Sequence, residues 1–72
     1  MRKKIELAKV TIETRDIGEE RAALVYEGEE NPYVIQKPNW VAVKQQLLYY
    51  LTKNELANEE EIKKLEEELF TS

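Results

Sequence analysis

The sequence predicts an α+β fold, a three-stranded antiparallel β-meander followed by two α-helices that pack on one face of the sheet. Two observations predict it. In the first half of the 72-residue chain, β-branched residues alternate with polar ones, which is the period of a half-buried strand. In the second half, apolar residues recur at helical spacing. A chain of this length has room for one core, so residues 1–72 are predicted to form a single small domain.

The first strand is predicted over residues 5–14. Four residues of one parity form its inward face: Ala8, Val10, Ile12 and Thr14. Ile5 and Leu7 are apolar on the opposite parity, so either a bulge near residues 7–8 shifts the pattern or the first residues are covered on both faces. Residues 15–20 follow as a turn in which Gly18 takes a positive φ.

The second strand, residues 21–27, is apolar on both parities and is therefore predicted at the centre of the sheet. A turn around Pro32 leads to the third strand, residues 33–37, which Pro38 ends. Five apolar residues are expected on the sheet face away from the helices: Ile5, Leu7, Ala23, Val25 and Val34. On so small a domain such a face would be covered by another copy or by a partner, so we expect a homodimer.

Helices are predicted over residues 40–53 and 59–70, and an Asn suited to the N-cap position precedes each of them, Asn39 and Asn58. The first helix has a broad apolar arc that should form most of the core: Trp40, Val41, Val43, Leu47, Leu48, Tyr50 and Leu51. The second helix has only a narrow apolar stripe: Ile62, Leu65 and Leu69. Its first turn holds three Glu, where the helix dipole favours negative charge.

The composition argues against catalysis, because the chain has no His and no Cys, and Asp16 is its only Asp. General acids and bases, activated nucleophiles and transition-metal sites are mostly built from those side chains. We therefore expect no enzyme activity, no metal site and no cofactor. Charged residues make up 36% of the chain, with a Glu and Lys bias typical of proteins from heat-loving organisms. No apolar run suits a signal peptide or a membrane span, and together with the absence of Cys this favours a cytoplasmic location.

One face of the first helix carries no acidic residue. It lies opposite the apolar arc and consists of Ala42, Gln45, Gln46, Tyr49 and Lys53. Interface cores favour aromatic residues and contain few charges, so a neutral face centred on Tyr49 is typical of a partner-binding or dimerisation surface. The sequence therefore predicts a non-catalytic protein–protein interaction module, such as a small regulator, inhibitor or adaptor, that self-associates.

A nucleic-acid-binding regulator is the alternative. It would use the sheet, with Lys9, Arg15 and Arg21 as phosphate contacts. The net charge of −4 and the acidic residues interspersed along the strands make this alternative weaker. Two runs of three Glu, residues 59–61 and 66–68, are interpreted as the solvated face of the second helix rather than as a docking or metal site.

Overall fold

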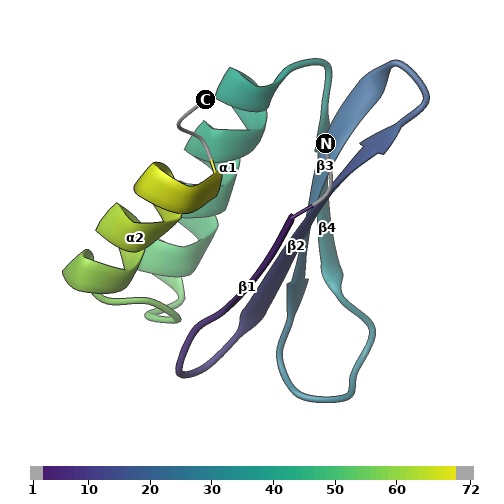
Figure 1. Cartoon of the computed structure of the whole chain (residues 1–72). Coiled ribbons are helices and arrows are strands. Elements are labelled where there is room, and N and C mark those ends of the chain that lie inside the picture. The colour runs from purple at the N-terminus through teal and green to yellow at the C-terminus, as the bar shows by residue number, and fades with distance from the viewer. Residues whose placement is uncertain (1–2, 70–72) are drawn as a thin grey trace.

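The computed structural model of the protein describes residues 3–69. Its elements follow in the order β1 (Lys3–Glu6), β2 (Thr11–Ile17), β3 (Glu20–Tyr26), β4 (Tyr33–Lys37), α1 (Trp40–Lys53) and α2 (Glu59–Leu69). The strands form one antiparallel sheet in the order β1-β2-β3-β4, and both helices lie on the same face of it (Figure 1). The predicted α+β class, an antiparallel sheet followed by two helices, is confirmed. The predicted number of strands is wrong, because the sheet has four.

The strand predicted over residues 5–14 is in fact a hairpin. Ile5 pairs with Ile12 across it, and the Leu7 N–H donates to the Val10 carbonyl at 2.8 Å, so residues 8–9 form the tip. Chain reversal explains the shift in apolar parity, because residue 5 pairs with residue 12 and both side chains then point to one face. The turn contains no Gly, Pro, Asn or Asp, so it lacks the usual sequence signal of a turn.

The turn predicted over residues 15–20 is narrower than expected. Strand β2 runs on to Ile17, which pairs with Glu20, so the turn consists of Gly18 and Glu19 alone. Gly18 has a φ of +61°, as predicted, and two-residue hairpin turns are favoured by such a residue. The last pairs before this turn include an ion pair, with Arg21 Nε 3.0 Å from Asp16 Oδ1. Pairing therefore continues through residues whose composition is typical of a turn.

The core lies between the helices and the sheet. Ten of its buried side chains come from both layers: Ile5, Ile12, Ala23, Val25 and Ile35 from the sheet, and Val43, Leu47, Leu51, Leu65 and Leu69 from the helices. Four residues expected on the far face thus belong to the helix-facing side, since Leu7 also packs against this cluster and only Val34 lies on the other face. Because β3 is apolar on both parities, its own sequence does not say which parity faces the helices. The pairing of Val25 with Ile12 decides it.

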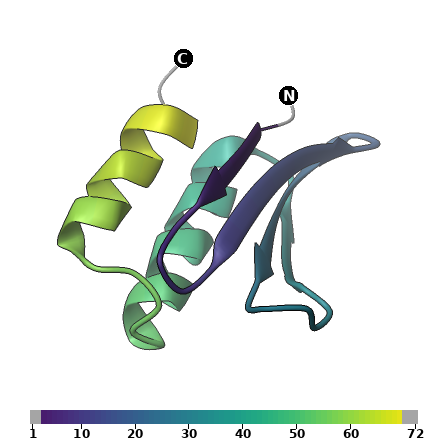
Figure 2. The same cartoon turned by 60° about the horizontal axis from the view of Figure 1, so that its bottom comes forward.

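The helices begin at the predicted caps. Asn39 Oδ1 accepts the Ala42 N–H at 2.9 Å, and Asn58 Oδ1 accepts the Glu61 N–H at 2.8 Å. The two helices lie side by side (Figure 2), and Lys44 Nζ of α1 is 3.4 Å from Glu66 Oε2 of α2. Val41, expected in the apolar arc, is exposed because it lies about 120° around the helix from the buried Leu47. Phe70, the predicted last residue of the second helix, lies outside the described residues.

Candidate interaction surface

Exposed large apolar side chains gather near β4 and α1. Five are found in the described part of the chain: Ile17 (42% exposed), Tyr33 (43%), Val34 (48%), Val41 (67%) and Tyr49 (59%). All except Ile17 belong to β4 or α1, and α1 packs directly over β3 and β4. In a chain with 36% charged residues, this concentration of exposed apolar side chains distinguishes β4 and α1 from the other elements.

Strand β4 is an edge strand, because it pairs only with β3. The outer side of its backbone, from Tyr33 to Lys37, therefore carries N–H and C=O groups that no other described strand pairs. Pro32 and Pro38 border this strand. Lys37 is its only charged residue. Such an edge can add a further strand from another chain.

An open groove of about 420 Å³ follows this edge. All five residues of β4 line it, and Gln46 of α1 forms the opposite wall. Gln46 sits one helical turn before the aromatic Tyr50 on the side of α1 that faces the strand. Its amide offers both a donor and an acceptor. The groove can therefore take an extended segment that pairs with β4 and contacts α1 with its side chains.

A stacked pair of tyrosine rings lies at one end of β4. Tyr33, the first residue of β4, stacks on Tyr50 of α1 with ring centroids 4.0 Å apart and ring planes 6° from parallel. Desolvation, reinforced by the charge of Glu27, raises the pKa of Tyr50, so this ring stays neutral at physiological pH. On the exposed side of the same helix, Lys53 Nζ lies 5.6 Å from the centre of the Tyr49 ring, within reach of a cation–π interaction.

The residues of the predicted α1 face lie partly beside the groove and partly in solvent. Gln45, Tyr49 and Lys53 are exposed, whereas Ala42 and Gln46 are half-buried. Gln46 lines the groove beside β4, and Lys44 turns toward α2. The predicted face therefore borders β4, where the exposed Tyr33 lies on the helix side of the sheet and the exposed Val34 lies on the other side. Val34 was expected on a sheet face that a partner or a second copy covers, whereas Tyr33 was not predicted as part of an interaction surface. The signal for Tyr33 is that the last strand of a meander is an edge strand by its position in the order.

The three residues of the nucleic-acid alternative do not come together. Arg15 and Arg21 lie on opposite faces of the sheet, since Arg15 pairs with Ala22, the neighbour of Arg21. Arg15 forms an ion pair with Glu13, whose hydrogen bond and charge raise the pKa of Arg15, and Arg21 forms one with Asp16. Lys9 lies at the hairpin tip, outside the paired strands, where its Nζ donates to the Glu55 carbonyl at 3.0 Å.

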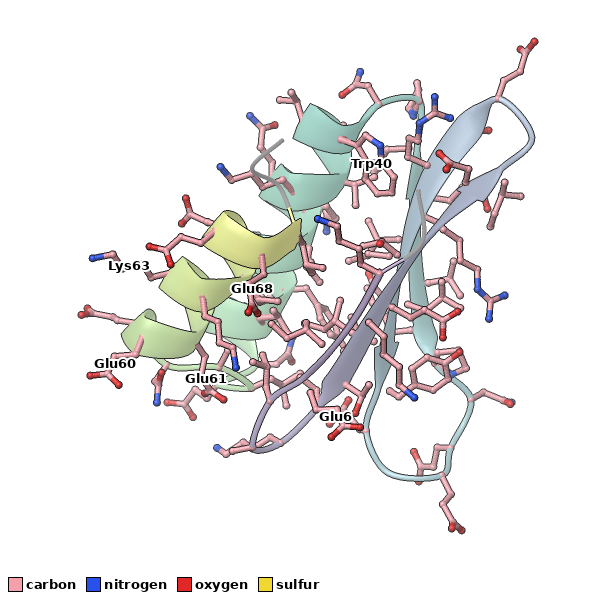
Figure 3. The ribbon with its side chains drawn as sticks, in the orientation of Figure 1. Glu6, Trp40, Glu60, Glu61, Lys63 and Glu68 are labelled. Atoms are coloured by element: carbon pink, nitrogen blue, oxygen red, sulfur yellow. The ribbon has the colours of Figure 1, made fainter. Side chains whose placement is uncertain are left out.

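A second depression lies between the tip of the β1–β2 hairpin and the α1–α2 connection, with a volume of about 400 Å³. Glu61 lines it and is already engaged, since its Oε2 accepts the Ala8 N–H and its Oε1 accepts the Asn58 N–H, both at 3.0 Å. Figure 3 shows Glu61 directed toward the hairpin, whereas Glu60 and Lys63 point away from the sheet. These contacts fasten α2 to the hairpin, which gives this depression a structural explanation.

Residues 3–69 contain neither a metal-binding cluster nor a membrane-spanning helix. No group of three or more acidic side chains in this range is placed to hold a metal ion, and no helix in it is long and apolar enough to cross a membrane. Comparison with known proteins gave no match, whether to family models, to curated proteins or to solved structures. The surface formed by β4 and α1 is therefore the main candidate for a functional site.

Proposed function

We propose that this protein is a non-catalytic protein–protein interaction module that binds through the β4–α1 surface. This surface consists of Tyr33, Val34, Gln36 and Lys37 of β4 with Gln46, Tyr49 and Lys53 of α1. The observation that supports the proposal is a coincidence in space: an unpaired strand edge and a groove along it lie beside the exposed ring of Tyr33. Each is an element of known peptide- and protein-binding surfaces.

The energetics of binding favour this surface over the rest. A partner strand on β4 would replace water on the backbone edge with direct hydrogen bonds, which give affinity without needing a particular sequence. Tyr33 and Tyr49 would supply the apolar contact area, since Tyr buries a large ring at a small loss of conformational freedom. The acidic outer face of α2 lacks such groups, with Glu59, Glu60, Lys63 and Glu67 all exposed.

Capture from a host lysate with matched variants tests the proposal. Tyr49→Glu places a charge on the β4–α1 surface, whereas Ile17→Glu places the same charge on an exposed apolar residue of another region. Both should keep the fold, because neither residue belongs to the core cluster. We expect Tyr49→Glu to lose a protein that the wild type and Ile17→Glu retain, as identified by mass spectrometry.

Equal capture by Tyr49→Glu and the wild type would remove the β4–α1 surface as the binding site. A nuclease-treated sample distinguishes the rival function. If all bound material disappears with nuclease, the partner is nucleic acid and the proposal fails. Lys9→Glu combined with Arg21→Glu would then show whether the basic residues of the sheet carry that binding.

A further inference from the structure

We infer that the partner of strand β4 is β4 of a second copy of this chain, paired antiparallel about a two-fold axis at Ile35, so that two sheets join into one. The inference rests on the proposed function, because it uses the same surface and names its occupant. Three features support it: the order of residues in β4, the flanking prolines and the contrast between the two sheet edges.

The order of residues in β4 is self-complementary. In antiparallel pairing about Ile35, Tyr33 lies opposite the partner's Lys37, Val34 lies opposite the partner's Gln36, and Ile35 meets the partner's Ile35. The single charged residue of the strand therefore faces an aromatic ring and not its own copy. Lysine and tyrosine attract each other through a cation–π interaction, whereas like charges directly opposite each other would repel.

The prolines restrict the register. Pro32 and Pro38 each lie three residues from Ile35, so pairing about Ile35 places both prolines outside the paired segment on either side. This register pairs all five residues of β4 with all five of the copy. A shift by one residue in either direction would leave one residue of each strand opposite a proline, which has no N–H to donate. The symmetric register is therefore the one that uses the whole edge.

The faces of the joined sheet also match. Tyr33, Ile35 and Lys37 have the parity of the helix-facing side, so the helix layers of the two copies would flank one seam. On α1 the side toward this seam carries Gln46, which lines the groove, with Ala42 and Tyr49 beside it. No acidic residue occurs within α1. Helix α1, which lies nearest the seam, therefore meets its own copy without repulsion between carboxylates.

The β1 edge of the sheet is less suited to strand addition than the β4 edge. Strand β1 has four residues, of which three are charged, and short, Lys-rich edges are poor templates for strand addition. It is also tied to α2, since Lys3 Nζ donates to the Glu68 carbonyl at 2.9 Å. Association through β4 alone closes as a dimer, because each copy then has only a protected edge left.

Introducing charged residues at the two exposed positions Val34 and Gln36 of β4 tests the register. In one variant Val34 and Gln36 both become Lys, and in the other both become Glu. By the proposed pairing, each variant alone places like charges opposite each other, so its dimer dissociation constant should rise at least about tenfold. An equimolar mixture places Lys opposite Glu at every such pair and should restore the dimer. Sedimentation equilibrium of the full chain up to high micromolar concentration measures both.

Several results would overturn the inference. A wild type that stays monomeric at high micromolar concentration excludes the self-pairing, and if Tyr49→Glu still loses a captured protein, the proposed function survives with a different occupant. A dimer that neither variant weakens lies on another surface. Retained circular dichroism of both variants confirms that folding is intact.

A second measurement covers the case in which the charged variants fail to fold. The chain has no natural Cys, so Val34→Cys and Gln36→Cys introduce single thiols at exposed positions. A mixture of the two should form a disulfide dimer on oxidation faster than either variant alone, because residue 34 lies opposite residue 36 only in the proposed register. Equal rates in all three samples would contradict the register.

Discussion

The two edges of the sheet differ in how they are protected. Strand β1 is short and mostly charged, and α2 holds it from the side through the Lys3–Glu68 hydrogen bond. Strand β4 has one charged residue, exposes Tyr33 and Val34, and leaves a groove along its backbone. Both edges belong to one small sheet under the same solvent conditions. The difference shows that protection against strand addition is stronger on β1, where charged residues and α2 act together, than on β4 with its bordering prolines.

The largest expected effect comes from the helix that protects β1. Leu65 of α2 is fully buried in the core cluster, so Leu65→Ala should remove about 2–5 kcal/mol from the free energy of unfolding. A loss of this size is a large part of the total stability of so small a protein. Urea unfolding followed by circular dichroism measures it. A change below about 1 kcal/mol would show that α2 contributes little to the core.

The N-cap of α2 should have a smaller effect. Asn58→Ala removes the acceptor of the Glu61 N–H and should lower the free energy of unfolding by about 1 kcal/mol. Because Glu61 also holds the hairpin beside β1, hydrogen exchange of the Ala8 amide should accelerate while amides of β4 change less. Asn39→Ala, which removes the cap of α1, is the matched control. Equal acceleration at both edges would contradict the separate protection of β1.

Glu61 should make the β1 side sensitive to acid. Hydrogen bonds from the Ala8 and Asn58 backbones lower the pKa of Glu61, so the folded state binds its proton less readily than the unfolded chain. The stabilisation is complete above the ordinary pKa of glutamate and is lost as the pH falls through the lowered value. Glu61→Gln should reduce this loss, as thermal unfolding at several pH values would show. Glu60→Gln, a change in the neighbouring exposed carboxylate, should leave it nearly unchanged.

The smallest expected effect concerns an ion pair between α1 and α2. Lys44 and Glu66 form an ion pair at 3.4 Å with both side chains partly exposed, so Lys44→Ala should change the free energy of unfolding by less than about 1 kcal/mol. Added salt should reduce even this difference. A larger, salt-independent loss would mean that Lys44 contributes through the packing of its aliphatic stem.

The sequence predicted the helices well because their signals are local. Both caps lie at the predicted Asn residues, and the stripe of Leu65 and Leu69 is buried as expected. The first hairpin was missed because its tip, Ala8 and Lys9, has no turn-forming residue, so two strands resembled one long strand with a fault in its alternation. The faces of β3 could not be assigned because register depends on the partner strand.

The candidate surface was predictable in part. The acid-free face around Tyr49 follows from helical spacing, and the structure leaves Tyr49 exposed. The contribution of β4 depends on two facts absent from any local pattern: its place at the end of the sheet, and the stacking of Tyr33 on Tyr50, residues that are 17 positions apart in the sequence. The periodicity of a sequence carries no information about contacts between distant segments.

The link between Lys3 and Glu68 also constrains the order of events during synthesis, because it joins residues 65 positions apart. On the ribosome, the four strands and α1 emerge before α2, so the nascent chain lacks the side chains of Leu65 and Leu69 in its core. During that interval β1 is as uncovered as β4. Helix α2 therefore completes the protection of the β1 edge, which until then depends on the charged residues of that strand alone.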